Sequence, residues 1–168
     1  MTCSFRMTGD FADRVREDLL RPHAHAYERV AFIAARAAAS GDGLLLLAST
    51  YHPVADEDYV RDPAVGAQMS EAAIRKAMQI AWQSKCAIVH VHLHDHWGAP
   101  GFGQLDLEEN ARFMPEFFNA QPRMPHAALV LSRDAAAGRV WHERGTDPID
   151  FDEVIETGWP MRISRRAQ

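Results

Sequence analysis

Four of the nine histidines in this chain fall within one seven-residue segment, His90 to His96, which reads His-Val-His-Leu-His-Asp-His and is followed by Asp106. A neutral imidazole binds divalent transition metals through one ring nitrogen. Alternate residues of a strand face the same side, so a His-x-His pair directs two imidazoles to one point. Two histidines and a carboxylate, with one position left for water, make a catalytic zinc site. We therefore expect the chemistry of this chain here.

More than one pair of histidines has the required spacing. We predict that His92, His94 and Asp106 bind the metal, because His96 stands against the following Trp-Gly and His90 lies deeper in the expected strand. His90 and His96 then become candidates for contacts behind the ligands or with substrate. The alternative is a structural role, in which alternate histidines satisfy hydrogen bonds in the core or face solvent.

Other enzyme classes lack their motifs in this sequence. The chain has no His-Glu-x-x-His, no His-x-Glu with Pro-Cys-x-x-Cys, and no Gly-x-Ser-x-Gly elbow. Its two cysteines, Cys3 and Cys86, are too far apart in sequence to form a Cys-x-x-Cys pair, and Cys86 opens an apolar segment typical of a core thiol.

The composition is that of an ordinary globular protein. The 168 residues fit one domain, 1–168, with 47% apolar and 24% charged residues. A net charge of −5 gives no basic footprint for nucleic acid. No apolar run approaches the length of a membrane span, and the first ten residues lack the apolar core of a signal peptide. We expect a cytoplasmic protein that binds neither nucleic acid nor membrane.

Hydrophobic periodicity predicts alternating helices and strands. Helices are expected from Asp10 as cap to residue 20, from Ser70 to Trp82, and from residue 105 or 106 past Phe113, where Pro115 would kink or end the helix. Strands are expected at 3–8, 44–51, 86–91, 127–131 and 138–141, with a weaker edge strand at 159–163, and loops at 54–67 and 97–103. The segment 28–39 is ambiguous, although propensity alone weakly favours helix.

The histidine segment and its surroundings resemble the JAMM motif of the JAB/MPN metalloproteases. That motif is His-x-His, a loop, then Ser-x-x-Asp, and this chain has His92-Leu93-His94, the loop 97–102, then Gly103-Gln104-Leu105-Asp106. The family also places a glutamate upstream at the start of an apolar segment, a place that Glu28 occupies. The resemblance covers roughly residues 25–142 in the order of motifs. Members of similar size are small bacterial proteins encoded beside ubiquitin-activating-type and ubiquitin-conjugating-type enzymes in antiphage operons.

The resemblance implies an α/β fold with a curved mixed sheet flanked by helices and Zn²⁺ at one end of the sheet. It implies a strand in place of the helix that propensity favours after Glu28. By the same resemblance, His92, His94 and Asp106 would hold the zinc, which lowers the pKa of a water toward ~7, and Glu28 would act as general base. The substrate would be the C-terminal tail of a ubiquitin-like protein, in a precursor or a conjugate, and the activating and conjugating enzymes of the same operon become possible partners.

Three departures from the motif stand in this sequence. Asp95 replaces the proline usual after the second histidine, and the gap from His94 to Asp106 is one residue longer than usual. Gly103 replaces the serine whose hydroxyl assists the tetrahedral intermediate. We expect the backbone N–H of Gly103 or the side-chain amide of Gln104 to take over that task. The alternatives are an inactive MPN scaffold that binds a ubiquitin-like or other partner, and a small-molecule metal hydrolase or metal-binding protein on a different fold.

Overall fold

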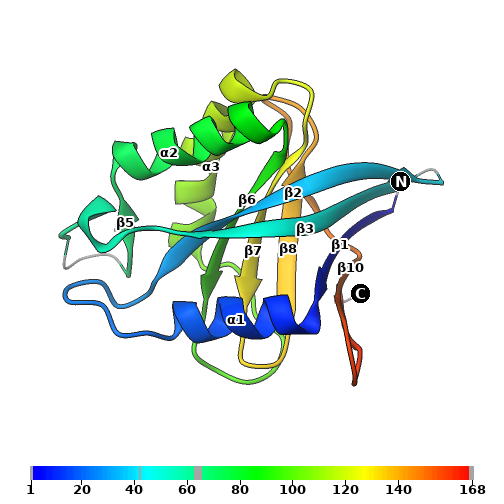
Figure 1. Ribbon diagram of the computed structural model, residues 1–168, viewed down its shortest axis with the longest axis horizontal. Coiled ribbons are helices and arrows are strands. Elements are labelled where there is room, and N and C mark those ends of the chain that lie inside the picture. The colour runs from blue at the N-terminus through cyan, green and yellow to red at the C-terminus, as the bar shows by residue number, and fades with distance from the viewer. Residues whose placement is uncertain (1, 42, 63–65, 167–168) are drawn as a thin grey trace.

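The protein is an α/β structure in which one curled mixed sheet is packed with helices (Figure 1). The computed structural model describes residues 2–41, 43–62 and 66–166. Its helices are α1 (Gly9–Leu19), α2 (Glu71–Ser84), α3 (Gln104–Ala120) and the short 3-10 helix η1 (Asp56–Asp58).

Eleven strands are formed within the described part of the chain. They are β1 (Cys3–Thr8), β2 (Val30–Ser40), β3 (Gly43–Pro53), β4 (Tyr59–Val60), β5 (Gln68–Met69), β6 (Ala87–Leu93), β7 (His126–Leu131), β8 (Ala136–Trp141), β9 (Ile149–Asp150), β10 (Glu153–Thr157) and β11 (Arg162–Arg165). The main sheet has the order β11-β10-β1-β3-β2-β6-β7-β8-β9, and β4 and β5 pair separately. Within the main sheet β1 is parallel to β10 and β3, β6 is parallel to β7, and the other pairs are antiparallel.

The sheet curls around α1. One continuous core joins the apolar side of this helix, including Phe11 and Val15, to inward residues of seven strands, from β1 through to β10. A register shift between Ala34 and Ala35 in the β2–β3 hairpin adds local bending, as bulges do. The seam of the curl lies between β8 and β11, where the Ala136 N–H donates to Ser164 Oγ at 3.0 Å.

Helices α2 and α3 cover the other face of the sheet (Figure 1). Strand β6 is buried on both faces, so its residues alternate between two cores. Val89 and Val91 face the α1 core, whereas Ile88 packs in the core under α2 and α3. His90 and His92 lie two and four residues after Ile88 on this strand, so their side chains also face α2 and α3.

A buried ion pair fastens α1 to the sheet. Arg16 and Glu156 are 5% and 2% exposed, and their side chains lie 2.5 Å apart. Arg16 also donates to the carbonyls of Ser132 and Ala135 in the β7–β8 turn. The guanidinium therefore ties together three elements that are distant in sequence.

Most predicted elements are confirmed, and several boundaries need correction. The segment after Glu28 is a strand, as the family resemblance implied and propensity did not. Thr8, and not Asp10, caps α1 by accepting from the Phe11 N–H at 3.2 Å. The predicted loop 54–67 contains η1 and β4, with residues 63–65 outside the described part, and the predicted edge strand lies at 162–165. Pro115 does not end α3, which continues to Ala120.

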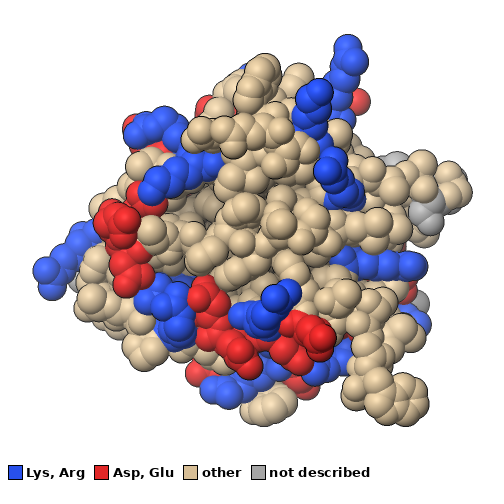
Figure 2. Space-filling model, in the orientation of Figure 1, with Lys and Arg blue, Asp and Glu red and all other residues tan. Residues whose placement is uncertain are grey.

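Charges on the surface are mixed. On the face shown in Figure 2, basic and acidic side chains are interspersed, with both kinds along the lower edge where α1 lies in Figure 1. Among the described residues, no helix is both long and apolar enough to cross a membrane.

Candidate metal centre

The pairing of β2 with β6 brings the glutamate to the histidines. The two strands are antiparallel, with Val30 opposite His92, so the start of β2 meets the end of β6. Glu28 lies in the bend just before β2, two residues from this contact, and not on the strand itself. His94 directly follows β6, and its N–H donates to the Leu131 carbonyl at 2.9 Å. The sheet register thus places residues 28, 92 and 94 at one end of the sheet.

Three side-chain atoms converge at this end. His92 Nε2 and His94 Nε2 lie 3.2 Å apart, and Asp106 Oδ2 lies 3.4 Å from the first and 3.5 Å from the second. Zinc bonds to nitrogen and carboxylate oxygen are about 2.0–2.2 Å long, so tetrahedral ligands stand about 3.3–3.6 Å from one another. The three observed separations therefore fit the ligand shell of a zinc-sized ion.

Glu28 adds a second carboxylate to the same point. One ligand atom from each of Glu28, His92 and His94 lies within 4.8 Å of the others, close enough to hold one metal ion. The side chain of His92 is 2% exposed, whereas those of His94 and Asp106 are 23% and 22% exposed. The centre is therefore anchored in the core on one side and open to solvent on the other.

The backbone around Glu28 is held by hydrogen bonds to other parts of the chain. The backbone N–H groups of Tyr27 and Glu28 both donate to the Gly66 carbonyl. A Cβ at Gly66 would lie 3.4 Å from Glu28 Oε2, so the backbone passes close to this carboxylate. On the next residue, the buried guanidinium of Arg29 donates to two carbonyls, those of Arg21 and Pro22, and to Asp56.

Asp106 is positioned by the start of α3. Its Oδ2 accepts the backbone N–H of Gly103 at 2.7 Å, which closes the first turn of the helix. Partial burial opposes ionisation of Asp106, but the interaction with His92 and the N–H of Gly103 outweigh it and hold the pKa of this carboxyl at about 2. The group is therefore a carboxylate near neutral pH, the state that binds cations.

The other two histidines lie outside the cluster. His90 is buried behind His92, with a ring-centroid distance of 5.8 Å, and burial lowers its pKa well below the usual range. His96 is exposed, and its Nδ1 lies 3.0 Å from the Trp97 carbonyl. The structure therefore brings together His92, His94 and Asp106, with His90 behind them and His96 at the surface.

The two residues expected to replace the motif serine are already engaged. The Gly103 N–H is taken by Asp106, and the Gln104 amide donates to Glu108 Oε1 at 2.9 Å along the exposed side of α3. Both donors are thus paired with carboxylates in this structure, and their part in stabilising a reacting oxygen stays a prediction. A Cβ at Gly103 would lie 3.3 Å from Asp106 Oδ2, so a serine there requires a small shift of the carboxylate.

Asn110 belongs to the surroundings of the centre and was missed from the sequence. It lies one helical turn after Asp106 on α3 and is 1% exposed. A polar residue four positions after a proposed ligand, on the same helical face, was the available signal.

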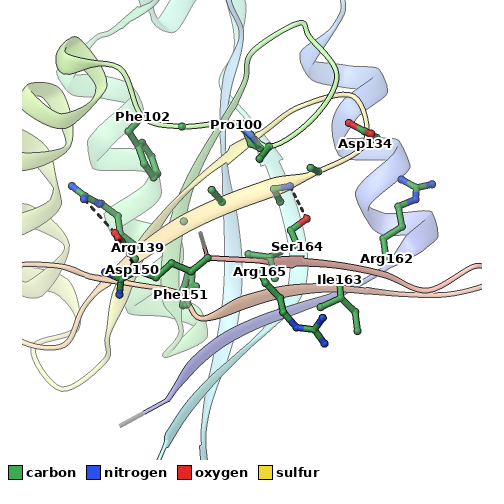
Figure 3. A pocket seen from close by; sticks show the side chains of 18 of the residues that line it. Pro100, Phe102, Asp134, Arg139, Asp150, Phe151, Arg162, Ile163, Ser164 and Arg165 are labelled. Atoms are coloured by element: carbon green, nitrogen blue, oxygen red, sulfur yellow. Dashed lines mark hydrogen bonds and ion pairs between the residues drawn. The ribbon is translucent and has the colours of Figure 1, made fainter. Parts of the chain in front are cut away.

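A cavity of about 650 Å³ has Phe102 in its lining (Figure 3). It lies between the loop that carries Pro100 and Phe102 and the strands β8 and β11. The Phe102 ring lies 6.1 Å from that of His92, and the guanidinium of Arg139, which pairs with Asp150 at 3.3 Å, stands 5.4 Å from the Phe102 ring. Phe102 therefore lines this cavity and also lies near the His92 ring.

Comparison with known proteins adds little. No protein-family model and no curated protein matches the chain. One solved structure with partial similarity is the N-terminal domain of STIL from Trichoplax adhaerens, at 12% identity and a TM-score of 0.33. The match covers 78% of this chain, which spans only 38% of the length of that structure. A likeness this weak carries no argument about fold or function.

Proposed function

We propose that this protein is a zinc-dependent peptidase or isopeptidase of the JAB/MPN type. The observation that carries the proposal is the convergence of His92, His94, Asp106 and Glu28 at the open end of the sheet. The ligand-type atoms of the first three have the mutual distances of a tetrahedral zinc shell. Zinc, when bound, supplies the Lewis acidity for hydrolysis of an amide bond.

Residues of the chain would carry out proton transfer and admit water and substrate. Glu28 has a carboxylate oxygen within 4.8 Å of the ligand nitrogens of His92 and His94, within reach of a water bound at the centre. Its carboxylate accepts a proton from the attacking water and returns it to the leaving amine when the amide bond breaks. Asp106 and His94 face solvent in part, which leaves a path for water and substrate.

The substrate class rests on the resemblance of the motif. We propose the C-terminal tail of a ubiquitin-like protein, in a precursor or attached to a target, within a bacterial antiphage conjugation system. The cavity beside Phe102 supports an extended chain next to the centre, because it runs from a residue that contacts His92 along the seam of the sheet. Recognition of the folded partner would supply the rest of the specificity.

The test is cleavage of a ubiquitin-like protein from the same genome, extended at its C terminus. The zinc-loaded chain is expected to cleave the whole protein and to cleave the isolated tail peptide poorly. Equal rates on both would contradict the proposed substrate class. An apoprotein as active as the zinc form would contradict the metal mechanism.

A non-catalytic scaffold is the second candidate, and one observation favours it. Gly103 lacks the hydroxyl of the motif serine, and its N–H and the Gln104 amide are both engaged by carboxylates. Loss of one oxyanion donor commonly costs about 10²–10³-fold in rate. Full zinc loading, tight binding of the ubiquitin-like protein and no cleavage would select the scaffold.

A further inference from the structure

Behind the metal centre, three buried side chains carry polar atoms that lack hydrogen-bond partners within the described part of the chain. They are His90, His92 and Asn110, which are 6%, 2% and 1% exposed. Both ring nitrogens of His90, both amide atoms of Asn110, and Nδ1 of His92 have no partner in hydrogen-bonding geometry among the described residues, although the Asn110 side chain lies beside the His90 ring. A buried polar group without a partner costs about 1–3 kcal/mol, so five such atoms in one place require an explanation.

All three side chains line one small cavity between β6 and α3. Its volume is about 50 Å³, and Glu28, Asp106 and Phe113 contribute to the same wall. A water molecule needs a cavity of roughly 10–15 Å³ and two to four polar partners. This cavity exceeds that size, and the three residues that carry unpartnered atoms are among those that line it.

Among these atoms, Nδ1 of His92 has the strongest need for a hydrogen-bond partner. His92 Nε2 faces His94 and Asp106, so metal binding at this nitrogen leaves the ring proton on Nδ1. A metal-bound histidine almost always donates this second N–H to an acceptor, which fixes the ring and raises its basicity. No described protein atom accepts from His92 Nδ1.

We propose that this cavity is a site for ordered water that links His92 Nδ1 to Asn110 and His90. In this arrangement the water accepts from His92 and donates to the Asn110 carbonyl or to a His90 nitrogen. Asn110 and His90 are then positioning residues, which act on the metal through the orientation of His92. The water site stands on the unpartnered atoms alone, whereas its effect on the metal rests on the proposed zinc centre.

The first measurement is a high-resolution crystal structure of the zinc-loaded protein. We expect a water within hydrogen-bonding distance of His92 Nδ1 and of Asn110. A direct hydrogen bond between Asn110 and His90 with no water in the cavity would overturn the proposal. This result does not depend on catalysis, so it separates failure of the water site from failure of the proposed function.

The second measurement is zinc affinity, by chelator competition, of Asn110→Leu against Asn119→Leu. Asn119 lies on the same helix but is exposed, with partners Glu116 and Arg144, so it is a matched control. Loss of a partner behind a metal ligand typically weakens metal binding 10–100-fold. We expect that loss for Asn110→Leu, with the control unchanged. Equal affinities in the two variants would overturn the positioning role.

A third variant, Asn110→Ser, keeps the proposal testable if Asn110→Leu does not fold. Asn110→Ser replaces the amide with a hydroxyl, which can still hydrogen-bond water, and enlarges the cavity, so water can still bridge to His92. Its zinc affinity is expected to lie closer to that of the wild type than to that of Asn110→Leu. If Asn110→Leu fails to fold, Asn110→Ser decides: affinity equal to the parent, with the bridging water visible, supports the site, and a dry cavity contradicts it.

Discussion

One oxygen of Asp106 accepts the backbone N–H of Gly103 at 2.7 Å and also faces His92 at 3.4 Å. The same carboxylate oxygen thus closes the first turn of α3 and completes the cluster of potential ligands. The start of α3 and the metal centre therefore depend on the same carboxylate oxygen.

Substitutions at Asp106 should separate these two roles. Asp106→Asn keeps an oxygen that accepts from Gly103, so we expect a stable helix and a large loss of zinc affinity. Asp106→Ala removes both functions and should also lower the free energy of unfolding by about 0.3–1.5 kcal/mol, as loss of a helix cap does. Zinc titration and urea unfolding check the pair. Unchanged zinc affinity in Asp106→Asn would remove Asp106 from the ligand set.

Glu28 is expected to act in catalysis without holding the metal. Glu28→Gln preserves the size of the side chain and its place against Gly66, but cannot accept the proton. We expect one zinc per chain and a loss of about 10²–10⁴-fold in turnover. Loss of zinc in this variant would make Glu28 a ligand instead, and undiminished turnover would require another base.

Filling the cavity beside Phe102 tests the proposed path of the substrate. Ala137 lines this cavity on β8, so Ala137→Trp should slow cleavage of the ubiquitin-like protein at least tenfold while zinc binding stays the same. Ala38→Trp, at an exposed position of β2 on another part of the surface, is the matched control. If both variants cleave like the parent, the substrate does not occupy the cavity.

Burial of His126 predicts loss of stability in acid. The side chain is fully buried, its Nδ1 accepts from the Ile88 N–H, and its Nε2 lies 3.3 Å from the Gln121 carbonyl. Burial lowers the pKa of His126 to about 4. The unfolded chain therefore takes up the proton first, so the contribution is full above pH 6.5 and is lost as the pH falls toward 4, by about 3 kcal/mol at pH 4.

The comparison that isolates this residue is His126→Gln, measured on metal-free protein. Glutamine can also accept from and donate to the backbone but does not titrate. Urea unfolding of both proteins from pH 7.5 to pH 4 should show the steeper loss in the wild type. Parallel curves would mean that His126 does not control this transition.

The sequence was enough to predict that Glu28, His92 and His94 lie together, but not what surrounds them. The alternation of β6 was enough to place His90 and His92 on one face, and the resemblance supplied the position of Glu28. Propensity failed at 28–39 because an alanine-rich segment favours helix locally, whereas pairing of β2 with both β3 and β6 makes it a central strand. Tertiary pairing of this kind is not visible in local composition.

Other features depended on contacts between distant residues. The engagement of the Gly103 N–H by Asp106 follows from the geometry of a helix start, and a motif alignment does not contain it. Strand β10 was missed because its partners, β1 and β11, include one that is about 150 residues away in sequence. Asn110 reaches the centre only because α3 packs against β6 at that point.

The most direct test of the metal centre is a crystal structure of zinc-loaded protein with anomalous data at the zinc edge. We predict a single peak bonded to His92 Nε2, His94 Nε2 and Asp106 at about 2.0–2.2 Å, with Glu28 outside bonding distance. A peak held by His90 or His96, a peak with Glu28 in place of Asp106, or no peak at saturating zinc would contradict the account.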